Sequence, residues 1–109
     1  MTIAAFRKLA LSFPNSEELP HFEKTSFRVN KKIFATLSEK DNLVCLMLSV
    51  EDQFDFCQFD KSVIYPVPNN WGLKGATYVD LKKVNKEVLI DALTAAYNNK
   101  VKQNLDFKD

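Results

Sequence analysis

The alternation of apolar and polar positions is clearest in residues 26–50, where three β-type runs are separated by two short polar turns. β-branched and aromatic residues stand on both sides of residues 30–32, a pattern typical of a β-hairpin. The last run, residues 43–50, is apolar at successive positions, which favours a central strand with both faces covered. The segment therefore predicts an antiparallel meander whose first turn is short and cationic.

Apolar residues at helical spacing occur near both ends of the chain, and a third helix is predicted between them. Thr2 is placed to cap the first helix, and Asn85 to cap a long final one. Ser49 precedes two acidic residues, as at many helix N-termini, so a short helix is expected from there to about Asp60. These helices carry the apolar residues needed to cover a sheet.

The remaining segments are less regular. Residues 19–25 are expected to form one irregular strand, because Pro20 suits a sheet edge or a strand start. Residues 66–75, rich in proline, asparagine and glycine, predict an irregular connection, and residues 78–81 predict a further strand. Residues 102–109 are expected to form a frayed tail.

The order helix, meander, helix, irregular hairpin, helix predicts an α+β fold. Its antiparallel β-sheet is made of the meander and the later hairpin, with helices packed on one face. A chain of 109 residues suits one hydrophobic core, so residues 1–109 are expected to form a single domain. The hydrophobic fraction of 46% and the charged fraction of 27% are typical of folded soluble domains, which argues against disorder.

The sequence also bears on location. No run of about 18 apolar residues is present, and Arg7 and Lys8 interrupt the apolar N-terminal segment, unlike in a signal peptide. We therefore expect a cytoplasmic protein with no membrane partner. Cys45 lies in the predicted central strand and Cys57 in an aromatic-rich segment, without CxxC spacing. Two buried, reduced thiols are the simplest interpretation.

The distribution of charge is more informative than its sum. A net charge of +1 is far from the strongly basic value of many nucleic-acid-binding domains. Residues 22–32, however, carry four cations against one carboxylate, and residues 61–86 carry five against one. Between them, residues 51–60 carry four carboxylates and no cation. Separate patches of both signs are therefore expected, and a positive patch can attract a polyanion even when net charge is small.

Catalytic and metal chemistry have few residues to build on. His21 is the only histidine, and no serine or cysteine lies in a recognisable nucleophile motif. Three histidine and cysteine residues are one fewer than a closed zinc site needs. The acidic residues of 51–60 could hold a hard cation, but a solvated helix face explains them more simply. The two glycines form no phosphate-binding loop. We therefore expect no enzyme activity, no catalytic residue, no metal and no cofactor.

Three segments carry a family resemblance: SFRVNKKIFATL at residues 26–37, VIYPVPNNWG at residues 63–72 and ATYVDL at residues 76–81. Together they resemble the MmcQ/YjbR family of small bacterial proteins, which are described as DNA-binding. The resemblance covers roughly residues 2–101 and implies a fold related to that of CyaY and frataxin. Relatives often have glycine where this chain has Asn30 and Lys31, a departure that leaves the turn geometry open.

The resemblance also implies a mode of DNA binding, since family members are described as presenting two hairpin wings. In this chain the first wing would be the hairpin around residues 30–32, and the second would come from residues 65–78. Weak contacts to the DNA backbone, rather than base readout, are the expected mode. Lysines at a hairpin tip are also common as solubility and edge-protection devices. The candidate DNA-binding residues are Lys24, Arg28, Asn30, Lys31, Lys32, Asn69, Asn70 and Lys74.

The alternative interpretation is a protein-interaction or small-ligand-binding module that uses the Trp71 loop and the segment Phe54–Phe59. A lone tryptophan in a loop rich in proline and glycine more often packs onto the core than onto a partner, so we expect Trp71 to be mostly buried. The phenylalanines at 54, 56 and 59 cannot share one narrow helical stripe. Either their helix is widely buried or a ring is exposed at an interface. The sequence names no protein partner.

Overall fold

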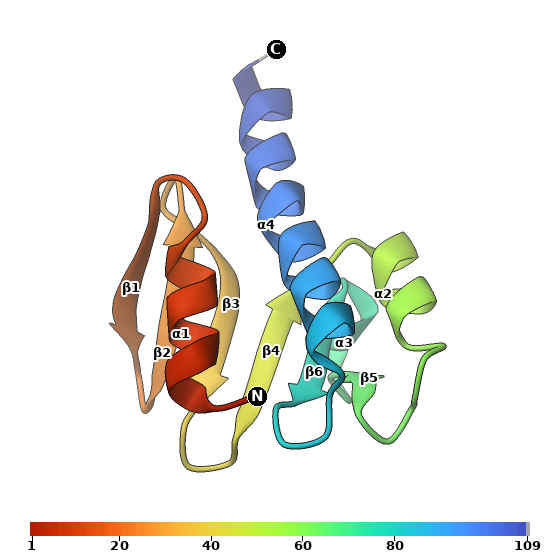
Figure 1. Ribbon diagram of the computed structural model, residues 1–109. Helices are drawn as coiled ribbons and strands as arrows, with labels where there is room; N and C mark the ends of the chain where they lie inside the picture. Colours follow the sequence, from red (N-terminus) through yellow and green to blue (C-terminus); the bar gives the residue numbers. More distant parts are fainter. Residues whose placement is uncertain (109) are drawn as a thin grey trace.

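The computed structural model describes the backbone of residues 1–108 and the side chains of residues 1–103. Six strands form one antiparallel sheet in the order β1-β2-β3-β4-β6-β5, and four helices accompany it (Figure 1). The fold is therefore α+β, as the sequence predicted. In chain order the elements are α1 (Ile3–Leu11), β1 (Ser16–His21), β2 (Lys24–Val29), β3 (Lys32–Ser38), β4 (Leu43–Met47), α2 (Val50–Phe56), β5 (Ile64–Pro66), α3 (Asn70–Leu73), β6 (Ala76–Asp80) and α4 (Lys86–Lys108).

Helices α1 and α4 cover the same face of the sheet, in front of it in Figure 1, and α2 packs beside α4. Successive side chains of a strand point to opposite faces, so alternate residues of the sheet meet these helices. Strand β4 lies in the interior of the sheet, which confirms the prediction of a central strand. The largest fully buried side chains of this core are Phe6, Phe27, Phe34, Leu37, Leu46, Ile64, Leu81, Leu89 and Leu93.

The opposite face of the sheet is called the open face below. It carries a second, smaller apolar cluster in which Cys45, Val67 and Ala76 are buried and Met47 and Tyr78 are partly buried. Cys45 and Tyr78 are cross-strand partners on β4 and β6, so their side chains lie on the same face. A hollow lies over this cluster, and Lys100 of α4 reaches its lining.

The helix starts follow the capping pattern of the sequence. The Thr2 hydroxyl accepts a hydrogen bond from the backbone N–H of Ala5, and the Ser49 hydroxyl accepts one from Asp52. The Asn85 carboxamide oxygen accepts a hydrogen bond from the backbone N–H of Glu87 at 2.8 Å. All three predicted caps are confirmed.

The prediction of one irregular strand over residues 19–25 is wrong, because this segment contains the end of β1, a two-residue turn and the start of β2. His21 and Lys24 are paired across the turn, which consists of Phe22 and Glu23. Phe22 takes a left-handed backbone conformation, with φ of 59°. The turn lacks the glycine, asparagine or aspartate that usually marks such a conformation, so no local sequence signal predicts it.

Two helix ends also differ from expectation. Helix α2 ends at Phe56, before the expected end near Asp60, and hydrogen-bonded turns follow it. Helix α4 continues to Lys108, and fraying of residues 102–109 in solution stays a prediction.

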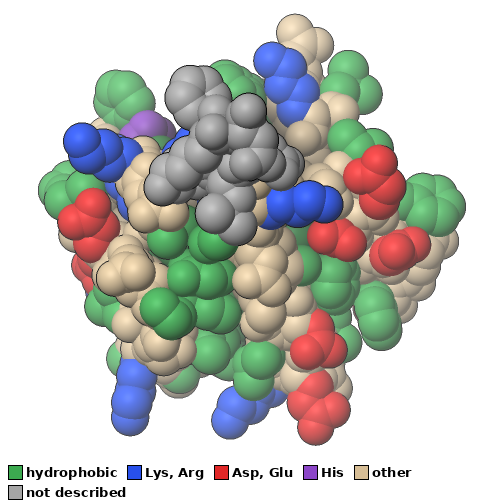
Figure 2. Space-filling view, turned by 90° about the horizontal axis from the view of Figure 1, so that it is seen from above, with side chains coloured by type: hydrophobic (Ala, Val, Ile, Leu, Met, Phe, Trp, Pro, Cys, Tyr) green, Lys and Arg blue, Asp and Glu red, His purple; other side chains and the backbone are tan. Residues whose placement is uncertain are grey.

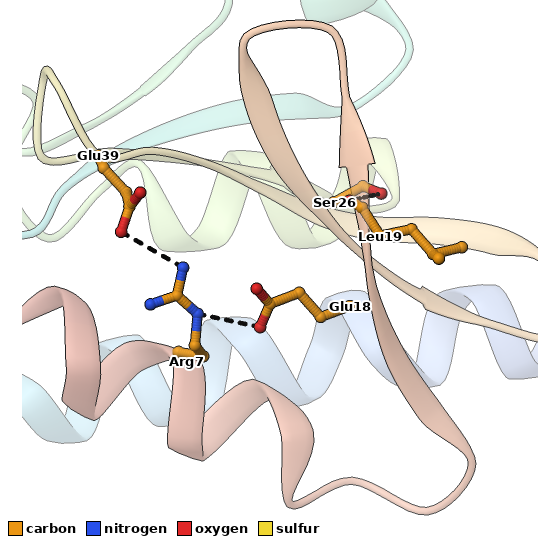
Figure 3. Close-up of polar contacts among 5 residues, drawn as sticks. All are labelled: Arg7, Glu18, Leu19, Ser26 and Glu39. Carbon is orange, nitrogen blue, oxygen red and sulfur yellow. Dashed lines mark hydrogen bonds and ion pairs between the residues drawn. The ribbon is translucent and has the colours of Figure 1, made fainter.

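Helix α1 is tied to the edge of the sheet by Arg7 (Figure 3). Its Nε donates to Oε1 of Glu18 on β1 at 2.9 Å, and its Nη2 donates to Oε1 of Glu39 at 3.3 Å. Such partly exposed ion pairs contribute about 0.2–1 kcal/mol each. The edge hairpin is also held by Ser26, whose hydroxyl donates to the backbone oxygen of Leu19 at 2.9 Å.

Candidate nucleic-acid interface

The turn between β2 and β3 consists of Asn30 and Lys31, with φ of 52° and 68°. Because Val29 and Lys32 are paired across it, this is a two-residue turn of type I′. Asparagine tolerates the left-handed conformation, whereas lysine pays a steric cost in it. The turn geometry that the sequence left open is therefore tight, and Lys31 is exposed at its tip.

A residue that the sequence analysis missed lies beside this turn. Lys100 of α4 lines a hollow together with Ile33, the residue that follows Lys32 on β3. Partial burial, and to a smaller extent the charge of Lys32, lower the pKa of Lys100. The sequence held one signal: Lys100 follows the fully buried Ala96 by four residues and so lies on the inward side of α4.

After the β2–β3 turn and α4, the connection between β5 and β6, which contains α3, is the third element that contributes a lysine. Lys74, which follows the short helix α3, places its Nζ 5.3 Å from the centre of the Trp71 ring. Lys74 and Lys100 line one hollow of about 340 Å³, together with Trp71. The predicted second wing is thus a strand pair whose connection is a helical turn. We call the surface formed by Lys31, Lys32, Lys74 and Lys100 the lysine end.

The two asparagines of the second wing have different environments. The Asn69 side-chain oxygen caps α3 by accepting a hydrogen bond from the backbone N–H of Trp71 at 2.8 Å. Asn70 is the first residue of α3 and is exposed. The Asn69 side chain therefore stabilises the start of α3, whereas the Asn70 side chain is accessible to a partner.

A buried glutamine fixes α3 in place. Gln53 of α2 donates through Nε2 to the backbone oxygens of Gly72 and Ala76, at 2.9 and 3.0 Å. Gly72 packs so closely that an added Cβ would overlap the backbone oxygen of Val67. The position of Trp71 and Lys74 therefore depends on a contact between α2 and α3 that sequence patterns do not report.

The two other cations of the predicted set lie elsewhere. On β2, Arg28 lies one residue and Lys24 three residues away from the buried Phe27. Both side chains therefore point to the opposite side of the sheet, the open face. Arg28 Nε donates to the Ser26 hydroxyl at 3.0 Å, so its side chain runs along the strand. Lys24 begins β2, at the opposite end of that strand from Lys31. The candidate residues thus divide between the lysine end and the open face.

The open face is hollowed. A hollow of about 670 Å³ lies over the cluster around Cys45 and Tyr78 and includes Lys24 and Lys100 in its lining. Trp71 also lines it and is 66% exposed, so the expectation that Trp71 is mostly buried is wrong. The ring lies on a helical turn whose glycine, Gly72, takes the buried position instead.

The phenylalanine segment belongs to a different surface. Phe54 and Phe59 are 67% and 63% exposed, whereas Phe56 is partly buried and stacks on Phe59. Phe59 lines a hollow of about 550 Å³ that also includes Asp60 and Asp91. In Figure 2, acidic side chains gather mainly at the right of the view, among hydrophobic ones. The Trp71 loop borders cations, while the phenylalanine segment borders a hollow with three carboxylates and one cation, Lys83.

The remaining candidate chemistry is limited within the described residues. They contain no group of three histidine, cysteine or carboxylate side chains placed to bind a metal ion. Both cysteines are buried, as predicted, and burial raises the pKa of the Cys45 and Cys57 thiols. His21 is half-buried at the end of β1, beside the ring of Phe22. In this part of the chain, no helix has the length and apolar character to cross a membrane.

Comparisons with known proteins agree with the resemblance. A family model described as YjbR matches residues 11–99. The fold is similar to the crystal structure of Deinococcus radiodurans protein DR2400, which carries a domain described as DUF419, with a TM-score of 0.74. That likeness covers 88% of this chain and 75% of the other at 21% identity, and therefore bears on the fold alone. A comparison with curated proteins gives no match.

Proposed function

We propose that this chain, which belongs to the YjbR family, binds duplex DNA weakly and through the phosphate backbone. The binding surface is the lysine end, to which the β2–β3 turn, α4 and the residue after α3 contribute cations. YjbR is not a known enzyme family, and the proposal is one of binding rather than catalysis. A location in the cytoplasm, where such DNA would be met, is part of the same proposal.

The observation that carries the proposal is the convergence of like charges from three elements. Lys100 lines one hollow with Ile33, the neighbour of Lys32 on β3, and another hollow with Lys74. No carboxylate lines that hollow among the described residues. Clustered cations without counter-charges cost stability, and a polyanion removes that cost when it binds.

The form of the surface favours backbone contacts. Lysine is a mobile point charge that suits phosphate oxygens, whereas bidentate base readout relies mainly on arginine, asparagine and glutamine. The lysine end contains no arginine, and Arg28 is hydrogen-bonded along its strand on the open face. Asn30 and Asn70 stand beside the lysines and can add hydrogen bonds to phosphate or sugar. An affinity in the non-specific range, with a Kd of about 10⁻⁴ to 10⁻⁶ M at physiological salt, is expected.

The alternative function is a protein-interaction module, and the exposure of Trp71 and Phe54 favours it. Trp71 and the phenylalanine segment border different hollows, however, because the hollow lined by Phe59 shares no described lining residue with the two hollows lined by Trp71. A protein partner on the phenylalanine segment is therefore compatible with DNA at the lysine end.

The test of the proposal reverses charge at the hairpin tip. Lys31→Glu with Lys32→Glu should weaken duplex binding strongly in a fluorescence anisotropy titration, since two phosphate contacts become repulsive. The matched control is Lys82→Glu with Lys86→Glu, which makes the same change in net charge at two exposed lysines before and at the start of α4. The control should retain most of the affinity. Equal losses in both double variants would show that only net charge matters and would reject the lysine end as the site.

A further inference from the structure

Phe22 combines two unfavourable features at the tip of the β1–β2 turn. Its side chain is 94% exposed, and its backbone has φ of 59° in the left-handed region. Bulky residues rarely adopt that conformation, and exposed phenylalanine gains little from the hydrophobic effect. Strained and exposed residues of this kind are typical of binding sites, where a partner supplies the missing contact.

Phe22 stands at the rim of the hollow on the open face. The ring of His21 lies 5.0 Å from that of Phe22 in a T-shaped arrangement. Trp71, on the connection between β5 and β6, lines the same hollow, and Tyr78 lies on its floor strand. Three elements therefore bring aromatic rings to one concave surface, although they are far apart in the sequence.

The charge of the hollow complements an anion. Among the residues whose side chains the structure describes, the lining includes Lys24 and Lys100 and no carboxylate. The apolar part of the lining comes from Ile33, Cys45 and Met47, which suits a flat uncharged group. A volume of about 670 Å³ is in the range of small-molecule binding sites and exceeds what one aromatic ring would fill.

We propose that this hollow binds unpaired bases of single-stranded DNA, stacked against Phe22 and Trp71, with Lys24 and Lys100 contacting the flanking phosphates. The inference rests on the proposed function, because Lys100 belongs to both surfaces, and it adds a second binding mode. Aromatic rings interleaved with cations are the recurrent means of holding single strands. Paired bases in a duplex expose only their edges to a protein, so a duplex cannot offer base faces to these rings.

The lone tryptophan of the chain makes the site directly observable. Base stacking on Trp71 should quench its fluorescence during titration with a single-stranded oligonucleotide of about ten nucleotides. An abasic oligomer with the same number of phosphates is the matched ligand, and it should bind more weakly and quench little. A mononucleotide, which has a base but one phosphate group, should quench only at much higher concentration.

The matched protein variant is Phe22→Asn. Asparagine tolerates positive φ, so the variant should keep or raise its melting temperature while its affinity for the single strand falls about 5- to 150-fold, as for loss of one stacked base. The control is Phe54→Asn, which removes another exposed ring, 67% accessible, from α2 and should leave binding unchanged. Phe22→Asn should also leave duplex affinity within about twofold.

Several results would overturn the inference. Equal affinity for the abasic and normal oligomers would show that phosphates alone are bound, and an unchanged affinity of Phe22→Asn would remove the ring from the site. A concentration-dependent change in Trp71 emission without DNA would identify a second copy of the chain as the occupant. If these failures occur while duplex binding stays sensitive to the hairpin lysines, only the single-strand site is rejected. Base-dependent quenching without duplex binding would instead reject the proposed duplex function.

Discussion

Gln53 offers the sharpest test of how the Trp71 loop is held. Its side chain is 8% exposed, and its Nε2 spans the gap between α2 and two backbone oxygens, those of Gly72 and Ala76. Gln53→Met keeps an unbranched chain of similar size but removes the donor. The substitution therefore deletes two hydrogen bonds with little change in packing volume.

The expected loss follows from the partners that remain. Gly72 still accepts from the N–H of Gly75 at 3.1 Å, and Ala76 still accepts from Val67 at 3.0 Å. Neither oxygen is left without a donor, so the cost is that of the two lost bonds, about 0.5–1.5 kcal/mol each. A total near 2 kcal/mol corresponds to a fall in Tm of roughly 10 °C for a domain of this size.

Thermal and urea unfolding followed by circular dichroism measure this loss, and an unchanged urea m-value would show that the unfolding reaction is the same. Gln53→Glu provides a second variant, because its carboxylate would face two carbonyl oxygens. It should be less stable than Gln53→Met at neutral pH, and because burial raises the pKa of the new carboxyl group in the folded state, stability should recover as pH falls through that raised pKa toward the unfolded value of about 4.3. A change below about 0.5 kcal/mol for Gln53→Met would refute the assigned role of these hydrogen bonds.

Three further predictions concern single side chains. Cys45 and Cys57 should react slowly with thiol reagents until denaturant is added, because burial raises the pKa of both thiols; rapid labelling of the native protein would contradict their burial. Lys31→Gly should stabilise the protein by about 0.5–1 kcal/mol in urea unfolding, since glycine relieves the left-handed strain at some entropic cost, and it should weaken duplex binding through the lost cation. The pKa of Lys100 is lower in the folded state than in the unfolded state, so the folded protein loses this proton at a lower pH. Between the folded and unfolded pKa values, the free energy of unfolding of the wild type should therefore increase as pH rises. Lys100→Met should lack that gain, and identical pH profiles of stability for both proteins would contradict it.

The features that the sequence predicted depend on neighbouring residues. The meander follows from alternating side chains and short polar turns, and the helix starts at Thr2, Ser49 and Asn85 follow from a capping side chain and the few residues after it. Both kinds of signal act within a few positions along the chain. They could therefore be found without knowing how the elements pack.

The features that the sequence did not predict depend on packing or lack a local signal. Trp71 is exposed because Gln53, on another helix, holds α3 with Gly72 turned inward. Lys100 joins the hairpin lysines only because α4 crosses the sheet toward the β2–β3 turn. The turn at Phe22 contains none of the usual turn residues, so pattern reasoning continued a strand through it.

The salt dependence of duplex binding by the wild-type protein tests the central proposal most directly. If Lys31, Lys32, Lys74 and Lys100 each neutralise one phosphate, log affinity plotted against log salt should have a slope of about −3.6 between 50 and 200 mM salt. Lys31→Glu with Lys32→Glu should reduce the magnitude of that slope by about two units, whereas Lys82→Glu with Lys86→Glu should leave it unchanged. Absence of salt-sensitive duplex binding by the wild type, or an equal slope in the hairpin variant, would contradict binding through the lysine end.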